Sequence, residues 1–150
     1  MHIFLGEFDG ATNTWATQDA LVGNFAVFGK EQETTGCGKC KEDAEANVEI
    51  TGTVPLTAAL LKEFKKGTLG GLGKENVLPW LRDNLHWRVT LADGTEKSRE
   101  EVPGLKVSVV STEVALPVGG LPVYSGVYEV HNEVTDGRPA GLNSGEHLYG

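Results

Sequence analysis

The feature of this sequence that most constrains its fold is a series of short apolar segments separated by turn-forming residues. The clearest of them, Leu85 to Leu91, alternates apolar and polar side chains along its whole length. Strict alternation is typical of a β-strand with one buried face, because successive side chains point to opposite sides. Strands are expected at residues 3–8, 21–28, 48–54, 85–91, 105–116 and 123–134.

A helical pattern interrupts the strands after residue 54. Leu56, Leu60 and Phe64 fall on one helical face, which predicts a helix over residues 55–66, and a second short helix is expected over residues 74–84. Six strands and two short helices predict a mainly β fold. We expect an antiparallel β-sandwich with one or two short helices, one of which covers a face.

Length and composition predict one domain. The chain has 150 residues, of which 39% are hydrophobic and 23% charged, enough to bury a single core. From Asp136 onward the sequence has many glycines and polar residues and no period. The expected division is therefore a domain over residues 1–135 and a flexible tail over residues 136–150.

The net charge narrows the range of partners. Thirteen Lys and Arg residues against 21 Asp and Glu residues give a net charge of -8, which disfavours nucleic acid and anionic membranes as partners. The sequence has no stretch of about 20 apolar residues and no basic and apolar signal-peptide region at its start. A cytoplasmic location is expected.

Two cysteines, Cys37 and Cys40, are the clearest candidates for chemistry. They lie two residues apart in a polar loop that also contains Gly36 and Gly38. A redox motif of the thioredoxin type is disfavoured because no helix is expected after the pair, and structural zinc normally needs four ligands. Two thiolates do suit Cu(I). Spacing alone leaves open a local disulfide, an unremarkable pair and a copper site.

No catalytic residues are predicted. The four histidines, His2, His86, His131 and His147, include no pair four residues apart that could present two ligands from one helix. Each is expected at the surface or on an edge strand. The chain also lacks a Gly-x-Ser-x-Gly elbow and an evident acid pair, so we do not expect it to be an enzyme by itself.

Six sequence blocks resemble the C-terminal domain of fungal tyrosinases, the type 3 copper phenol oxidases. They cover most of residues 2–130 in the family order. The blocks are His2-Ile3-Phe4-Leu5-Gly6, Leu21-Val22-Gly23 with Phe25 and Phe28, Gly36-Cys37-Gly38-Lys39-Cys40, Ile50-Thr51-Gly52-Thr53-Val54-Pro55-Leu56-Thr57, Asn84-Leu85-His86-Trp87-Arg88-Val89 and Leu105-Lys106-Val107-Ser108-Val109-Val110-Ser111.

The resemblance implies a regulatory role. In such enzymes this domain covers the dicopper site, keeps the proenzyme latent until proteolysis or acid releases it, and is thought to assist copper loading. It implies Cys37 and Cys40 as transient Cu(I) ligands and a tyrosinase catalytic domain as partner, in cis or in trans. Phe28, nine residues before Cys37, matches the aromatic residue that occupies the substrate entrance, although a core aromatic at a strand end is the alternative.

The chain departs from the whole family enzyme in one respect. It has none of the helical histidine motifs that bind the two copper ions, so oxidation of phenols by this chain is not expected.

Two other classes of function remain open at the level of sequence. The first is a structural or carbohydrate-binding β-sandwich with a local disulfide, in which Trp15, Trp80 and Trp87 are the candidate sugar platforms, although Trp87 is expected to be buried. The second is a thiol-disulfide redox protein that uses Cys37 and Cys40.

Overall fold

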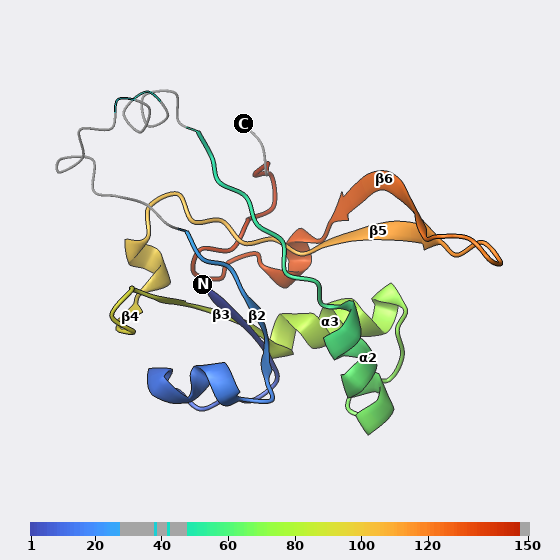
Figure 1. Ribbon diagram of the computed structural model, residues 1–150, viewed down its shortest axis with the longest axis horizontal. Helices are drawn as coiled ribbons and strands as arrows, with labels where there is room; N and C mark the ends of the chain where they lie inside the picture. Colours follow the sequence, from blue (N-terminus) through green and yellow to red (C-terminus); the bar gives the residue numbers. More distant parts are fainter. Residues whose placement is uncertain (28–37, 39–41, 43–47, 148–150) are drawn as a thin grey trace.

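A four-stranded antiparallel sheet forms the centre of the domain. The computed structural model describes residues 1–27, 38, 42 and 48–147. The strand order in this sheet is β2-β1-β3-β4 (Figure 1). The strands are β1 (His2–Leu5), β2 (Leu21–Asn24), β3 (Leu85–Thr90) and β4 (Glu96–Lys97).

Both faces of this sheet are covered where β1 pairs with β3. Ile3 lies opposite Trp87, and both point into the main core. Phe4 lies opposite His86 and points to the other face, where it stacks on Phe8. Because Ile3 and Phe4 are both buried, the segment reads as a continuous apolar run rather than an alternating strand.

Between residues 48 and 84, two α-helices precede β3. They are α2 (Thr57–Lys66) and α3 (Lys74–Asn84), and 3-10 helices lie at Thr12–Thr17, Arg99–Glu101 and Asn132–Val134. Gly67 ends α2 in a left-handed conformation, as the sequence predicts. Leu81 of α3 is buried in the main core. Among the described residues, no helix is long and apolar enough to cross a membrane.

A second sheet consists of one hairpin, β5 (Val110–Ala115) and β6 (Val123–Val130). It extends away from the four-stranded sheet (Figure 1). Every residue of β6 is exposed. The mainly β class with antiparallel sheets and short helices is therefore confirmed, with the two sheets arranged as a central layer and a protruding hairpin.

The C-terminal segment is part of the core, which differs from the flexible tail predicted for residues 136–150. Leu142 is only 1% exposed, and its N–H donates a 2.8 Å hydrogen bond to the Val107 carbonyl, while the Val107 N–H donates one of 2.8 Å to the Ala140 carbonyl. The Trp87 indole donates a hydrogen bond of 2.9 Å to the Pro139 carbonyl. Long-range partners thus order a stretch that has no local period, and the domain extends past residue 135.

Two further expectations from local patterns are wrong. Residues 48–54 form no strand, whereas β4, only two residues long, pairs with β3 across the turn at Gly94, whose φ is 84°. The alternation from Leu85 to Leu91 predicts that Leu91 faces inward, but it is 50% exposed because β3 ends at Thr90.

We predict that Leu142→Ala destabilises the isolated chain by about 2 to 5 kcal/mol, since it leaves a cavity in a packed core. Leu121→Ala is the matched control, because Leu121 is 85% exposed and should change stability by less than about 0.5 kcal/mol. Urea unfolding followed by tryptophan fluorescence measures both changes. Equal urea unfolding midpoints for the two variants would show that Leu142 belongs to an unpacked tail.

Candidate functional site

The predicted site residues belong to the segment between β2 and α2. Phe28, Cys37 and Cys40 all lie outside the described residues, so their roles as plug and copper ligands stay predictions. What the structure describes is the chain on either side of this segment, which we call its base: residues 23–27 before it and 48–54 after it.

Close packing holds the two ends of the segment together beside β2. The Phe25 N–H donates a 2.8 Å hydrogen bond to the Met1 carbonyl, which extends the pairing of β2 with β1 by one residue. After the segment, a Cβ at Gly52 would stand 2.2 Å from the Phe25 ring. Only glycine leaves room for that ring, and a Cβ at Gly23 would stand 2.8 Å from a Val54 methyl group.

Three large aliphatic residues flank the segment in the sequence. Val27 is the last described residue before the segment, and Val48 and Ile50 follow it. All three are more than half exposed. Their side chains are therefore accessible on the two stretches of chain that border the segment.

An aromatic layer lies on the face of the sheet opposite the main core. The Phe4 and Phe8 rings stack with centroids 4.2 Å apart, and the Trp15 ring meets Phe4 edge-on at 5.4 Å. The Trp15 indole donates a 3.0 Å hydrogen bond to the Asp9 carbonyl. Its burial and its bonded N–H indicate a structural role for Trp15.

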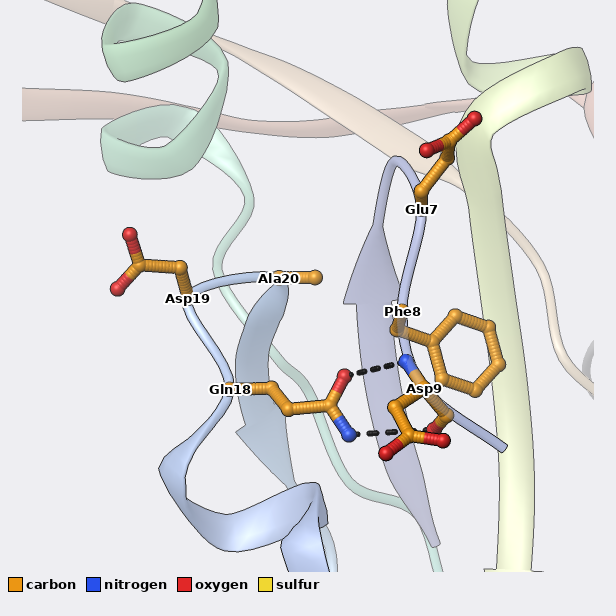
Figure 2. A pocket seen from close by; sticks show the side chains of 6 residues that line it. All are labelled: Glu7, Phe8, Asp9, Gln18, Asp19 and Ala20. Atoms are coloured by element: carbon orange, nitrogen blue, oxygen red, sulfur yellow. Dashed lines mark hydrogen bonds between the residues drawn. The ribbon is translucent and has the colours of Figure 1, made fainter. Parts of the chain in front are cut away.

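An acidic hollow of about 390 Å³ lies beside this layer (Figure 2). The Gln18 side chain closes one wall by accepting a 2.7 Å hydrogen bond from the Asp9 N–H and donating one of 3.1 Å to the Asp9 carbonyl. Its lining residues are Glu7, Phe8, Asp9, Gln18, Asp19 and Ala20. Nowhere in the described part of the chain do three His, Cys, Asp or Glu side chains gather so that they could hold a metal ion.

The four histidines occupy different environments. Burial, followed by the nearby guanidinium groups of Arg138, Arg88 and Arg99, lowers the pKa of His86, so its imidazole stays neutral near pH 7. His2 and His86 are half-buried, and His147 is exposed.

His131 is buried, and the expectation of a surface or edge position was wrong for it. Its Nε2 lies 2.8 Å from the Ser111 hydroxyl, and its Nδ1 lies 3.7 Å from a Glu133 carboxylate oxygen. The backbone N–H of His131 donates a hydrogen bond to the Val109 carbonyl. The residue therefore ties the base of the β5–β6 hairpin to the domain, and nothing in the local sequence marks it for that position.

The tryptophans offer little surface to a sugar. Trp15 and Trp87 are buried, and Trp80 is partly buried against the main core. A carbohydrate platform needs an exposed indole face, which Trp15 and Trp87 do not present.

Comparison with known proteins places the chain in a family. The model of the tyrosinase C-terminal domain family matches residues 1–109. The chain belongs to the tyrosinase C-terminal domain family. The match includes β1 to β4 and both helices, and it stops one residue before β5 begins.

Two fungal tyrosinases are similar to this C-terminal domain. The chain is 47% identical over 146 residues to a tyrosinase of Neurospora crassa, which covers 97% of the chain and 21% of the relative. It is 42% identical over 66 residues to a tyrosinase of Podospora anserina, which covers 41% of the chain and 12% of that relative. The chain thus spans about a fifth of the Neurospora protein. No solved structure gives a significant match.

We predict that Gly52→Ala destabilises the domain by about 1 to 3 kcal/mol, because the new methyl group displaces the Phe25 ring. Gly10→Ala is the matched control, since a Cβ at Gly10 meets nothing within 4 Å. Thermal unfolding compares the two variants. If both variants unfold at the wild-type temperature, Phe25 does not pack on Gly52 closely enough to hold the base of the cysteine segment.

Proposed function

We propose that this domain is the regulatory part of a fungal tyrosinase, which covers the dicopper active site, keeps the enzyme latent and assists copper loading through Cys37 and Cys40. The observation that carries the proposal is the 47% identity to a Neurospora crassa tyrosinase over 97% of this chain. Because the similarity covers only a fifth of that relative, a catalytic partner must come from sequence outside this chain. The domain itself is non-catalytic in this proposal.

The surroundings of the cysteine segment support a covering role. Phe28 directly follows Val27 in the sequence, and Val27, Val48 and Ile50 are all exposed. In this proposal the Phe28 ring enters the substrate entrance, and exposed aliphatic side chains such as Val27 exclude water where the two domains meet. Inhibition would then be steric, since a phenol and the Phe28 ring compete for one space.

The donor set suits copper delivery. Cu(I) is a soft ion that two thiolates can bind, and Cys37 and Cys40 provide two. Lys39 and Lys41 flank Cys40 and offset the negative charge of a bis-thiolate complex. Delivery is a ligand exchange in which copper–sulfur bonds are replaced by copper–nitrogen bonds to histidines of the partner. The metal stays Cu(I), and the released thiolates can take up protons.

We predict that the reduced chain binds one Cu(I) in competition with a chromophoric Cu(I) chelator, and that Cys37→Ser and Cys40→Ser each weaken this binding at least about tenfold. Chelator absorbance measures the transfer. Ser111→Ala, remote in sequence from the segment, is the control and should bind as the wild type does. Equal weak binding by all four proteins would remove copper from the proposal, and insulin reduction by the copper-free chain would point instead to a thiol-disulfide enzyme.

We predict that Phe28→Ala weakens inhibition of the matching tyrosinase catalytic domain without loss of folding. The reason is that a side chain that inserts into the partner does not pack in the core of its own domain. Activity on a phenol, measured against increasing concentration of the chain, gives the inhibition constant. Urea unfolding provides the second measurement, since truncation of a core phenylalanine costs about 3 to 5 kcal/mol. Unchanged inhibition together with a large loss of stability would assign Phe28 to the core.

A further inference from the structure

The β5–β6 hairpin carries an unusual share of the exposed apolar surface. Of the seventeen large hydrophobic residues that are exposed in the described part of the chain, ten lie between residues 110 and 130. No charged side chain occurs between Glu113 and Glu129. An isolated two-stranded hairpin is marginally stable in water, and monomeric proteins rarely expose an apolar patch of this extent.

Strand pairing places the aromatic residues on one face. Val110 pairs with Val130, Thr112 with Tyr128, and Val114 with Tyr124, and side chains of paired residues lie on the same side of a sheet. We call this set the tyrosine face. Tyr124 is 64% exposed and Tyr128 is 63% exposed.

The opposite face is the one that is tied to the domain. The Ser111 hydroxyl contacts buried His131, and the carboxylate of Glu129 pairs with Lys74 at the start of α3. Ser111 and Glu129 are themselves paired, so both contacts start from the same side of the hairpin. The tyrosine face therefore points away from α3 and toward solvent.

The tip of the hairpin is apolar as well. Leu116, Val118 and Leu121 are the most exposed large hydrophobic residues in the described part of the chain, and Val118 has no shielded surface. Together with the tyrosine face they form a continuous series of exposed apolar residues along the hairpin.

The edge of β6 is less suited to binding than its face. Between Thr112 and Val114 the register shifts so that β6 holds two more residues than β5, and Ser125 accepts the Val127 N–H within this bulge. A bulge interrupts the regular row of donors and acceptors that an added strand would need. A partner is therefore expected to pack against the face and the tip.

We propose that the tyrosine face and the tip of the β5–β6 hairpin dock on the tyrosinase catalytic polypeptide, and this inference rests on the proposed function. The Neurospora crassa tyrosinase is similar to this chain through the hairpin, since 146 of the 150 residues align, and about four-fifths of that relative lie outside the match. The family model ends at residue 109, before β5. The hairpin thus lies outside the match to the family model but inside the match to a full tyrosinase, whose remaining sequence is the occupant we assign.

The charge distribution separates this surface from the rest of the domain. The chain has a net charge of -8, yet the tip and the tyrosine face carry no charge. Docking through them depends weakly on salt, whereas docking through the acidic hollow would weaken or strengthen markedly as salt screens it.

The test titrates the chain into the matching catalytic polypeptide, whose phenol oxidase activity shows that it is folded. Calorimetry measures affinity, and enzyme activity is read in the same samples. We expect the double variant Tyr124→Ser/Tyr128→Ser, and separately Leu121→Ser, to bind at least about tenfold more weakly than the wild type. Phe64→Ser is the matched control, an exposed aromatic on α2, and should change affinity less than about twofold.

Each outcome decides the inference. The docking inference is overturned by any of three results: wild-type affinity in the hairpin variants, equal weakening by Phe64→Ser, or strong salt dependence of binding. If the chain still inhibits the enzyme in these cases, the proposed function survives. Loss of binding in the hairpin variants supports the docking inference. If the wild type binds but does not inhibit, only the latency part of the proposed function is refuted. If the wild type does not bind the catalytic polypeptide, both the docking inference and the proposed function are overturned. Self-association of the chain that is lost in Tyr128→Ser would then assign the hairpin to contact with a second copy of the chain. Unchanged urea midpoints show that the variants remain folded.

Discussion

The contact between Trp87 and Arg138 is the one on which the rest of the structure depends. Trp87 lies at the buried centre of β3, and the Arg138 guanidinium stands 4.2 Å from the centroid of its ring. The same guanidinium donates hydrogen bonds to the Leu85 and Val134 carbonyls. A partly buried cation must be satisfied in this way, and burial lowers the pKa of Arg138 while leaving it charged. One side chain thus joins the central sheet to the C-terminal segment.

The residues on both sides of the cysteine segment are packed into the domain. Before it, the Phe25 N–H extends the pairing of β2, which is an edge strand of the central sheet. After it, Gly52 lies against the Phe25 ring, and Val54 packs against the same core that contains Trp87. The positions of both ends of the segment therefore depend on the central sheet and its core.

The hairpin adds an exposed apolar surface on a different element. It is anchored at its base by His131 and by the pairing of Lys74 with Glu129, so its direction is determined by the domain even though its strands are exposed. A protein that must remain bound to a partner gains from two separated contacts, because the second forms at high effective concentration once the first is made. In the proposed function these two contacts are made by the Phe28 ring and by the hairpin, and either contact can form first.

The candidate site could be read from sequence only as residue types. Cys37 and Cys40 stand out through their spacing, and thiolate affinity for copper can be expected from sequence because it is a property of the donor atoms. Phe28 stands out only through the sequence blocks around it. The packing of Phe25 on Gly52 and the burial of His131 were not predictable in this way. Both depend on chain segments that are distant in sequence.

The sequence by itself determined the elements whose signals are local. The alternation from Leu85 predicts β3, and Gly67 marks the end of α2, because each depends on side chains within a few residues. Only the tertiary structure decided that residues 48–54 form no strand, that Leu142 joins the core and that β5 and β6 stand in solvent. Burial is set by contacts such as Trp87 with Pro139, 52 residues apart, and no local pattern encodes a partner at that distance.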